Sequence, residues 1–390
     1  MKKIAFFVQW LLCGGVENAL INLTEELVKR GNDVTIYVIK NKGDFVEKVP
    51  ETIGFKEIPM DSKVRKQIPV GGTTVTVRDC ISEKKYLTAI KFVMKHKLHH
   101  TEFAELNIAL EDVPTLEEKF DIAVNFHMHS PFLVWYLSER VLANTKYTWI
   151  HNDFETTQYN IIKLEKYLEC IDGFFCVGQN LADEFIERFP KYRKITEVAH
   201  NLIPIKEILI RAEEFYPKEF SGTKKIKLLT VGRLEEQKGY DIALDVCERL
   251  KKNNIKFEWF ILGNGTQRYL IEEEIKKRKI SGYFHLLGAK MNPYPYFKNC
   301  DIYVQTSRHE GYVTTVTEAK IFNCPIVTTN VSGAKEQLID GVNGEIADIT
   351  VDSVYERLFK LIQSEDIRIR YASELEKNKT IENETWLSKF

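Results

Sequence analysis

The chain of 390 residues is long enough for two α/β domains, each with its own core. Its formal net charge is −1, with 55 basic and 56 acidic residues spread along the sequence, so no global field favours a nucleic-acid partner. Its 7 cysteines are odd in number and form no Cys-x-x-Cys pair, a pattern typical of a reduced, cytoplasmic protein rather than of a disulfide framework or a zinc site.

Strands and helices alternate from the N-terminus. Ile4–Val8 predicts a buried strand, Val16–Lys29 a helix and Val34–Ile39 a second strand, an order that implies parallel pairing. The start of the chain also resembles a secretory signal, but its apolar run of about ten residues is followed by no small-residue cleavage site, so we interpret it as the first strand. No run reaches the roughly twenty apolar residues that span a bilayer. Further strands are expected at Ile122–Asn125, Tyr147–Ile150, Gly173–Val177 and Ile195–Val198.

Residues 61–118 interrupt this alternation. The stretch 70–77 predicts a small hairpin or loop and the stretch 83–98 a helix, so we interpret the segment as an insertion into the first domain. A polar linker near Leu202–Gly222 leads into a second series, in which helices such as Asp241–Lys251 alternate with strands. These strands are expected at Lys227–Val231, Glu258–Leu262, Tyr283–Leu286, Ile302–Gln305 and Pro325–Thr328. The predicted fold class is therefore α/β, with two domains.

The stretch Thr306–Lys320 is the most informative about function. It places Glu310 at the carboxyl end of a strand and Glu318 about one and a half turns inside the following helix, with Gly311 at the turn between them. Ligands of open α/β sheets bind beyond the carboxyl ends of the strands, where the N–H groups of a helix N-terminus are available to phosphate. Carboxylates on either side of such a phosphate accept hydrogen bonds from sugar hydroxyls. The pattern favours a nucleotide sugar, which has hydroxyls on both sides of its diphosphate.

Two cations follow the first strand of the second series. Arg233 and Lys238 can hold a diphosphate, the arginine by its planar fork and the lysine as a point charge. The alternative is an ordinary solvated loop, because Glu235 and Glu236 lie beside them in the sequence. The two glutamates downstream favour the diphosphate.

Small residues give weaker signals. Gly263 and Gly265 end a strand in a Gly-x-Gly pattern, but turn glycines are common. Thr314 and Thr315 either cap the predicted helix or present N–H groups where a phosphate would lie.

The glycine loop after the first strand suggests a second interpretation. Gly14 and Gly15 would also suit a dinucleotide-binding fold. However, the third glycine of G-x-G-x-x-G is absent, and Lys40 replaces the acidic residue expected after the second strand. The dinucleotide interpretation is therefore disfavoured.

Glu310 and Glu318, spaced as E-x7-E, resemble the paired-glutamate signature of a large family of retaining glycosyltransferases that includes sucrose synthase and many bacterial capsule- and lipid-sugar transferases. Three further motifs resemble those of the same family in the same order: the diphosphate motif GR…KG, the strand end GxG and the tail GG..E…DG.NG. They stand in this chain at Val231–Leu234 with Gln237–Gly239, at Ile261–Gly265, and at Val331–Gly333 with Glu336 and Asp340–Gly344. The first half is matched more loosely, by the Gly14–Gly15 loop and by His151.

The resemblance implies the GT-B fold, in which two Rossmann-like domains face each other across a cleft. The expected domains are residues 1–204 on the acceptor side, including the insertion, and residues 205–365 for the nucleotide sugar. In this fold the last helix usually crosses back to the first domain, which would place it at about residues 366–390.

The resemblance also implies roles for individual residues. Arg233 and Lys238 would stabilise the charge that grows on the leaving diphosphate. Glu310 would position sugar hydroxyls, and Glu318 would bind the ribose hydroxyls. The implied catalytic residues are Glu310, His151, Arg233 and Lys238. The implied donor contacts are Gly15, Arg233, Lys238, Gly263, Gly265, Glu310, Gly311, Tyr312, Val313, Thr314, Thr315 and Glu318.

Histidines follow two neighbouring strands of the first series. His151 alone would be interpreted as structural, but in the family a histidine at this place contacts the transferred sugar. His127 and His129, with Asn125, have a spacing that suggests metal. No third ligand follows in a suitable context and no Asp-x-Asp motif is present, so we predict no metal ion and no cofactor.

The resemblance implies a cytoplasmic, metal-independent hexosyltransferase that retains the anomeric configuration. A UDP-sugar is the expected donor and a glycan or lipid-linked hydroxyl the expected acceptor, in the synthesis of a bacterial surface polysaccharide or glycolipid. Two alternatives from other classes stay open. One is a catalytically silent protein of the same fold that supports a partner transferase, and the other is a sugar-nucleotide epimerase of the same fold.

The stretch 84–98 bears on the acceptor. Its apolar residues follow helical spacing and it holds five lysines. Such a helix either buries its apolar stripe in its own domain or lies on an anionic membrane surface, which would suit a lipid-linked acceptor.

Overall fold

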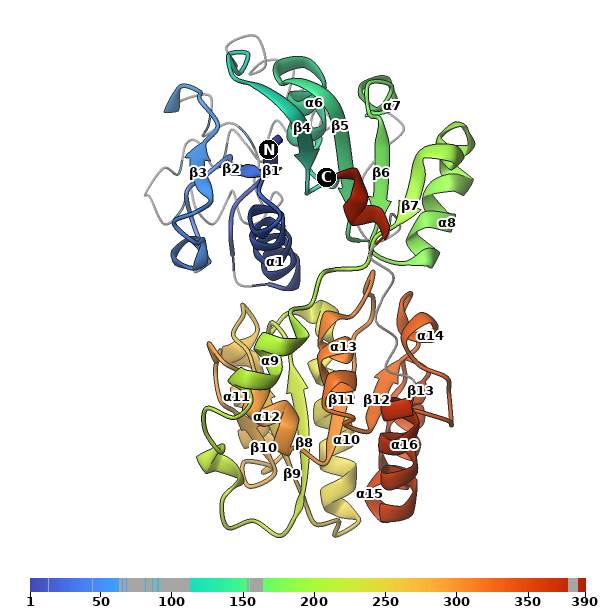
Figure 1. The fold of residues 1–390 in the computed structure, drawn as a ribbon. Coiled ribbons are helices and arrows are strands. Elements are labelled where there is room, and N and C mark those ends of the chain that lie inside the picture. Colours follow the sequence, from blue (N-terminus) through green and yellow to red (C-terminus); the bar gives the residue numbers. More distant parts are fainter. Residues whose placement is uncertain are drawn as a thin grey trace. The chain divides into compact units, whose positions relative to one another are not determined.

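The computed structural model of the chain describes residues 1–62, 113–152, 164–377 and 385–390, apart from Cys13 and Asp44, together with a few single residues between these ranges. It divides into two units, each built on one parallel sheet (Figure 1). The first unit comprises Met1–Val177, Glu184–Ala199 and Thr385–Phe390, and the second comprises Gly178–Asp183 and His200–Glu384.

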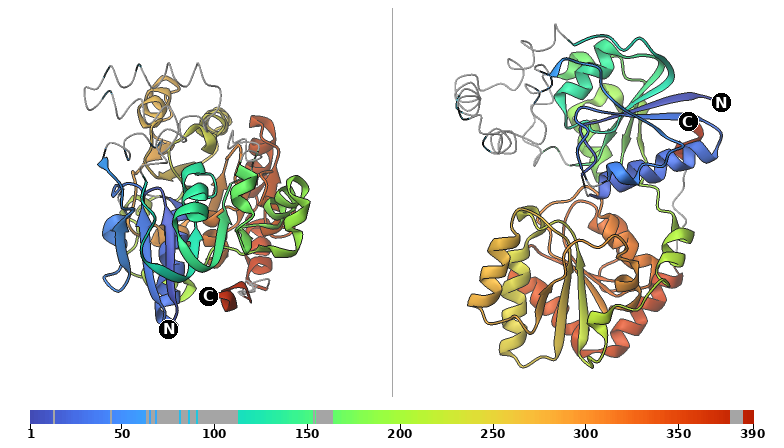
Figure 2. Two further views of the ribbon diagram at one scale, coloured as in Figure 1. Left: turned by 90° about the horizontal axis from the view of Figure 1, so that it is seen from above. Right: turned by 90° about the vertical axis from the view of Figure 1, so that its left-hand side faces the viewer.

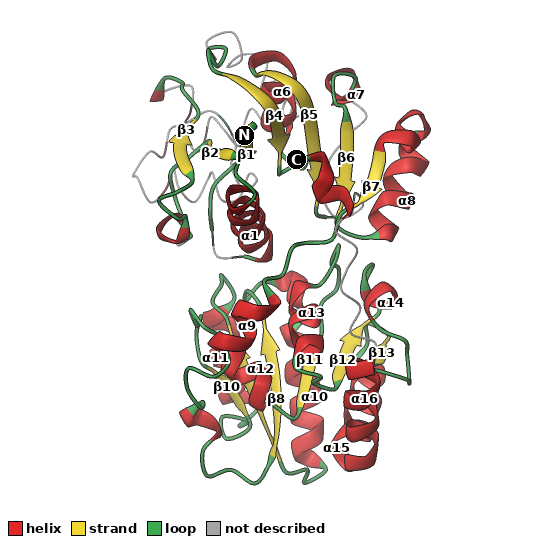
Figure 3. Cartoon of the chain, viewed as in Figure 1, coloured by secondary structure: helices red, strands yellow, loops and turns green. Residues whose placement is uncertain are grey.

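A seven-stranded parallel sheet forms the centre of the first unit, in the order β3-β2-β1-β4-β5-β6-β7 (Figure 3). Its strands are β1 (Lys3–Val8), β2 (Asp33–Val38), β3 (Gly54–Glu57), β4 (Lys119–Asn125), β5 (Leu142–Ile150), β6 (Gly173–Cys176) and β7 (Thr196–Val198). The central strand β1 is buried from Ile4 to Val8, as expected for a strand that is covered on both faces. β2 and β3 lie to one side of β1 and the later strands to the other, so the switch point of the first sheet lies between β1 and β4.

Neighbouring side chains of β1 pack on opposite faces of this sheet, because the side chains of a strand alternate. Phe7 contacts Tyr136 of α6, with ring centroids 5.8 Å apart, whereas Phe6 stacks on Phe390 at 6.2 Å. The C-terminal residues 385–390 therefore complete the core of the first unit. Its helices and turns are α1 (Gly15–Lys29), η1 (Val46–Lys48), α6 (Pro131–Arg140), α7 (Glu165–Leu168), η3 (Pro190–Ile195) and η6 (Thr385–Lys389), while α8 (Gln179–Arg188) has residues in both units.

The second unit holds a six-stranded parallel sheet in the order β10-β9-β8-β11-β12-β13. Its strands are β8 (Ile226–Val231), β9 (Phe257–Leu262), β10 (Phe284–Leu286), β11 (Ile302–Gln305), β12 (Ile326–Thr329) and β13 (Glu345–Ala347). The order matches that of the first sheet strand by strand, except that the first sheet has one strand more at its β7 edge. The switch point of the second sheet therefore lies between β8 and β11.

Helices cover both faces of this sheet (Figure 2). Leu228 and Leu229, adjacent in β8, belong to two separate apolar clusters, one on each face. The Leu228 face is packed against α10 (Tyr240–Lys252), α11 (Arg268–Lys277) and α15 (Val351–Gln363). The Leu229 face is packed against α9 (Ile205–Arg211), α12 (Tyr294–Asn299), α13 (Thr314–Ile321) and α14 (Ala334–Gln337). The remaining elements are η4 (Lys218–Phe220), η5 (Glu236–Lys238) and α16 (Glu365–Lys377).

The predicted α/β fold class is confirmed, and the expected strands are present in both sheets. Two further strands, β3 and β13, were not predicted from the sequence; they are only 4 and 3 residues long and lie at sheet edges. The predicted insertion at 61–118, with its helix at 83–98, lies largely outside the described residues. No helix in the described part of the chain is long and apolar enough to cross a membrane.

The C-terminal region differs from the expected crossing helix at residues 366–390. Residues 365–377 form α16 in the second unit, where Tyr371 belongs to the apolar core. Only Thr385–Phe390 belongs to the first unit, as a short 3-10 turn. The second unit also begins slightly earlier than expected, at His200 rather than at residue 205.

Candidate functional site

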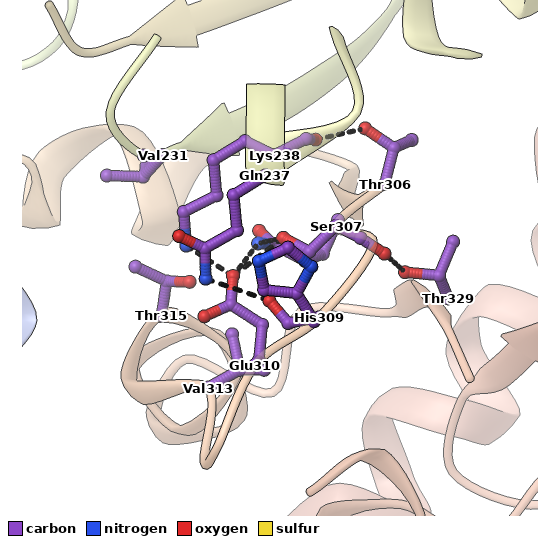
Figure 4. A network of polar contacts seen from close by, with 12 residues as sticks. Val231, Gln237, Lys238, Thr306, Ser307, His309, Glu310, Val313, Thr315 and Thr329 are labelled. Atoms are coloured by element: carbon purple, nitrogen blue, oxygen red, sulfur yellow. Dashed lines mark hydrogen bonds and ion pairs between the residues drawn. The ribbon is translucent and has the colours of Figure 1, made fainter. Parts of the chain in front are cut away.

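Two loops meet at the switch point of the second sheet. The loop 232–239 follows β8, and the loop 306–313 follows β11, so the motifs that the sequence separates by about seventy residues lie at one place (Figure 4). Lys238 of the first loop and Glu310 of the second form an ion pair. The two side chains are only 16% and 12% exposed. Charges removed from water in this way are stable only when the pair is supported by further hydrogen bonds.

That support comes from residues of β11 and the loop after it. Ser307 Oγ donates to Glu310 Oε1 at 2.7 Å, and Gln305 Nε2 donates to Ser307 Oγ at 2.5 Å and to Glu310 Oε1 at 3.3 Å. The hydroxyl of Tyr303 donates to Gln305 Oε1 at 2.8 Å and lies 2.7 Å from Thr315 Oγ1. A buried polar chain thus runs from the strand to the carboxylate (Figure 4). It leaves Glu310 Oε2 without a partner among these residues.

Hydrogen bonds to backbone carbonyls fix the two loops to each other. Thr306 Oγ1 donates to the carbonyl of Lys238 at 3.0 Å, and Gln237 Nε2 donates to the carbonyl of His309 at 2.9 Å. The N–H of Arg308 donates to the carbonyl of Gln237 at 2.8 Å. These bonds set the separation of Lys238 from Glu310.

Arg308 adds a charged contact across the same junction. Its guanidinium binds both carboxylate oxygens of Asp241, at 2.8 and 2.6 Å, and donates to the carbonyl of Glu236 at 3.1 Å. Asp241 lies in the first turn of α10. The loop after β11 is therefore anchored to the start of the helix that follows Lys238.

Two glycines make the close approach of the loops possible. Gly239 has φ +62°, and a Cβ there would lie 2.1 Å from the carbonyl oxygen of Thr306. Gly263, after β9, has φ +156°, and a Cβ there would lie 1.9 Å from the carbonyl oxygen of Gly232. Any other residue at either position would force the backbone apart.

Arg233 differs from Lys238 in its surroundings. Its side chain is exposed, and no described residue forms an ion pair or hydrogen bond with it. The neighbouring Glu235 does not neutralise it, because that carboxylate accepts hydrogen bonds from N–H and Oγ1 of Thr266 at 3.0 and 2.7 Å. Glu235 therefore does not pair with Arg233, and the exposed guanidinium is compatible both with a ligand site and with the solvated loop that was the alternative.

Glu318 lies in α13 and is partly exposed. Burial raises the pKa of its carboxyl to about 8, and the charge of Arg211 opposes that shift. In the ligand-free protein near pH 7, Glu318 therefore largely keeps its proton. The two glutamates of the E-x7-E pattern thus differ, because Glu310 has a cation beside it.

The first turn of α13 receives no side-chain cap. Val313 is its N-cap residue and has no side-chain acceptor to offer, so Thr314 and Thr315 begin the helix with N–H groups that no side chain caps. Gln337 of α14 holds the preceding residue by donating to the carbonyl of Val313 at 2.9 Å. Gly311 and Tyr312 complete the turn between Glu310 and this helix, and Gly265 begins the turn before α11.

The predicted residues of the first half lie in the first unit. Gly15 begins α1 after the loop that follows β1. His151, just after β5, is 6% exposed and packs its ring 4.5 Å from that of Phe126. Burial lowers the pKa of His151 to about 3, with a smaller contribution from His129, and neither ring nitrogen has a hydrogen-bond partner among the described residues. It is a neutral imidazole.

Several residues that shape the site were missed from the sequence. Gln305, Ser307, Arg308 and Asp241 act only through contacts between segments far apart in the chain, and nothing in their local pattern indicated this. For metal, the described residues contain no group of three or more His, Cys, Asp or Glu side chains that could hold an ion. The absence of a metal requirement stays a prediction.

Comparison with known proteins bears on this site. Residues 212–379, which include the whole switch-point region, match the model of the family described as glycosyl transferases, group 1. An uncharacterized glycosyltransferase of Methanocaldococcus jannaschii is 25% identical over 289 residues, which are 63% of this chain and 70% of that protein. Other curated relatives match over less than half of their own length.

Solved structures resemble the whole chain in fold. The Anabaena protein Alr3699/HepE in complex with UDP has a TM-score of 0.69 at 14% identity, covering 100% of this chain and 95% of that one. WaaG, a glycosyltransferase involved in lipopolysaccharide biosynthesis, has a TM-score of 0.64 at 13% identity, covering 99% and 97%. The expected GT-B fold is thereby confirmed. The match to the group 1 glycosyl transferases lies within the second unit and spans less than half of the chain.

Proposed function

We propose that this protein transfers a hexose from a nucleoside diphosphate sugar to an acceptor hydroxyl, with retention of the anomeric configuration. The observation that carries the proposal is the Lys238–Glu310 pair beside the exposed Arg233 at the switch point of the second sheet. A diphosphate is doubly charged and needs cations that are held in place, and a planar guanidinium with a lysine ammonium suits it. UDP is the expected nucleotide, which is supported by the UDP complexes of HepE.

The two cations would act on the leaving group. As the bond between the anomeric carbon and the diphosphate oxygen breaks, negative charge grows on that oxygen. Arg233 and Lys238 stabilise this charge more strongly in the transition state than in the bound donor. The ammonium of Lys238 is then shared between Glu310 and the phosphate, and the N–H groups at the start of α13 face the same charge.

The carboxylates would bind hydroxyls. Glu310 Oε2 is the oxygen that the polar chain leaves unused, so it accepts from the transferred sugar, while Glu318 accepts from the ribose. The acceptor hydroxyl attacks the anomeric carbon on the face from which the diphosphate leaves, and the leaving phosphate takes its proton. This route requires no protein base and no metal ion.

The acceptor is proposed to be a glycan or a lipid-linked sugar in the synthesis of a surface polysaccharide or glycolipid. The likeness to WaaG supports this setting. A cytoplasmic protein that touches the membrane surface through residues 84–98 would suit a lipid-linked acceptor, although that stretch lies largely outside the described residues.

Calorimetry with UDP and a panel of UDP-sugars, followed by turnover assays with and without simple glycoside acceptors, tests the proposal. We expect UDP to bind, acceptor-dependent release of UDP, unchanged rates in a chelator, and a product whose anomeric coupling constant matches that of the donor. Donor binding without any turnover would favour a silent partner protein. Turnover without an acceptor to an epimeric sugar would favour an epimerase, and an inverted product would overturn the retaining route.

A further inference from the structure

The switch point of the first sheet holds a second group of polar side chains, which the proposed donor site does not use. β1 and β4 are the strands on either side of this point. Gln9 follows β1, Asn125 ends β4, and His127 lies two residues beyond. Open α/β sheets bind ligands where two such strand ends diverge.

Backbone hydrogen bonds orient the two polar side chains. The N–H of Gln9 donates to Nδ1 of His127 at 3.2 Å, which in a neutral ring leaves the proton on Nε2. The N–H of His127 donates to Oδ1 of Asn125 at 3.0 Å, which fixes the amide with Nδ2 on its other side. Each side chain thus keeps a donor that its backbone contact does not use.

The amide donor of Asn125 is unsatisfied. Asn125 is 0% exposed, and its Nδ2 meets no acceptor among the residues that the structure describes. Leaving a buried donor unpaired destabilises a folded protein, so this amide calls for a partner such as a ligand hydroxyl or a water molecule. His127 is 3% exposed and His129 is partly exposed, with its ring 5.0 Å from that of His127. The group therefore extends from the buried amide toward solvent.

This group carries no charge. Burial lowers the pKa of His127 well below its usual range, and the neighbouring imidazoles of His129 and His151 add to that shift. Burial also lowers the pKa of His129 to about 4. No carboxylate or ammonium group of the described residues contributes to the pKa of His127. An anion would lose its hydration here without meeting a cation of the described residues, whereas a hydroxyl needs only hydrogen bonds.

We propose that this edge binds uncharged hydroxyl groups of the acceptor sugar, through Nδ2 of Asn125 and Nε2 of His127. The inference rests on the proposed function, because that function defines the acceptor. It adds that the acceptor ring entering this site carries neither phosphate nor carboxylate.

Two conservative variants remove the donors and keep the internal contacts. His127→Asn places an amide oxygen near the position of Nδ1, so the N–H of Gln9 keeps an acceptor while the Nε2 donor is lost. Asn125→Asp keeps an oxygen for the N–H of His127 and replaces the donor nitrogen by an acceptor. The control is His285→Asn in β10, since Nε2 of His285 is likewise buried without a hydrogen-bond partner but lies in the second unit, 3.7 Å from Oε1 of Glu258.

Saturation-transfer NMR on the full chain in the presence of UDP tests the proposal. The probes are the methyl glycosides of glucose, galactose and N-acetylglucosamine, with methyl glucuronide and glucose 6-phosphate as anionic counterparts. We expect at least one methyl glycoside to bind and the anionic counterparts not to bind. His127→Asn and Asn125→Asp should weaken that binding by roughly tenfold or more, while His285→Asn should not.

The outcomes separate this inference from the proposed function. UDP affinity, measured by calorimetry on the same samples, should be unchanged in all three variants. Failure of the native protein to bind UDP would count against the proposed function alone. The present inference is overturned if no neutral glycoside binds, if the anionic probes bind equally well, or if the two variants bind as the native protein does. It is also overturned if His127→Asn slows acceptor-free hydrolysis of UDP-glucose as much as transfer, because the site would then hold the transferred sugar.

Discussion

The two sheets share one strand order around their switch points, yet the chemistry at those points is opposite (Figure 3). In the second sheet the strand ends carry the Lys238–Glu310 ion pair and the exposed Arg233. In the first sheet they carry Asn125 and His127, both buried and without charge. The backbone topology therefore places a site in each unit, and the side chains decide which charge that site accepts.

The difference lies in how each buried group is compensated. The Glu310 carboxylate, 12% exposed, is surrounded by a lysine and a chain of hydroxyl and amide donors. His127 and His151 have no charged partner among the described residues, and burial lowers the pKa of both. A variant that removes the charged or hydrogen-bonding partner of a buried group in one unit should therefore leave ligand affinity at the other unit unchanged.

The largest effect is expected for Lys238→Met. The change removes one cation from the proposed diphosphate site and leaves the Glu310 carboxylate without its partner. We expect UDP affinity to fall roughly 10- to 150-fold, from about 1.5–3 kcal/mol for a charge-assisted bond, and transfer to fall further. Calorimetry with UDP gives the affinity.

The control for this variant is Lys227→Met. Lys227 lies near the amino end of β8, away from the switch point, and pairs with Asp301 at 2.8 Å. Its side chain is 18% exposed, so it matches Lys238 in burial. It should lower the melting temperature without changing UDP affinity. Equal losses of UDP affinity in both variants would show that Lys238 acts only through stability.

The next effect is expected in the first unit, for His151→Phe. The imidazole packs beside Phe126 and Trp149, and neither of its nitrogens has a hydrogen-bond partner in the part of the chain that the structure describes, so a phenyl ring should fit without breaking a hydrogen bond there. We expect unchanged or higher thermal stability, because two unpaired buried nitrogens are removed. Transfer should fall roughly tenfold or more if His151 contacts the sugar. A joint loss of melting temperature and activity would instead make His151 a structural residue.

Much of the second unit could be predicted from the sequence, for a physical reason. Its strands are short apolar runs that end at a motif, as at Ile302–Gln305 before Glu310, and the periodicity changes to that of a helix after Gly311. The edge strands β3 and β13 could not be recognised, because β3 ends in Lys56 and Glu57 and β13 begins with Glu345, so neither is an apolar run.

The site was less predictable than the fold. The sequence indicates Arg233, Lys238 and the two glutamates as candidates, but only the fold shows that Lys238 pairs with Glu310 across 72 positions. The raised pKa of Glu318 is equally invisible in the sequence, since Glu310 and Glu318 are the same residue type. That pKa depends on burial, and the pairing of Glu310 depends on a lysine from another loop, so both are properties of the assembled unit.

A smaller effect is expected for Arg308→Ala. This residue does not touch the proposed ligand and only holds the loop of Glu310 to that of Lys238, through Asp241 and the carbonyl of Glu236. We expect UDP affinity to fall about threefold to tenfold, with partial rescue by Arg308→Lys, which keeps the charge but loses the planar fork.

Arg278→Ala is the control for the Arg308 variant. Arg278 also binds several carboxylates, those of Asp245, Glu248 and Glu274, but on the outer surface of α10 and α11. Its loss should leave UDP affinity unchanged. If the two arginine variants cannot be distinguished in UDP affinity, the anchoring of the loops by Arg308 has no functional role.

An effect of similar size is expected for the pH dependence of UDP affinity, which sharpens the contrast between the two glutamates. The pKa of Glu318 is about 8 in the ligand-free protein, against 4.5 for an ordinary glutamate. Between these values the folded chain holds a proton that the unfolded chain has lost, so this group makes stability fall as pH rises from 4.5 to 8, with no further change above.

Ribose hydroxyls donate to the ionised form, so binding UDP should release a proton and affinity should rise with pH up to about 8. We expect a rise of roughly threefold to tenfold between pH 6.5 and 8. The terminal phosphate of UDP also titrates near the lower end of this pH range and contributes to the pH dependence of UDP affinity. In the Glu318→Gln variant only the contribution of the nucleotide remains, so comparison with the native protein gives the contribution of Glu318. A native protein and a Glu318→Gln variant with parallel pH profiles for UDP affinity would exclude Glu318 from the ribose site.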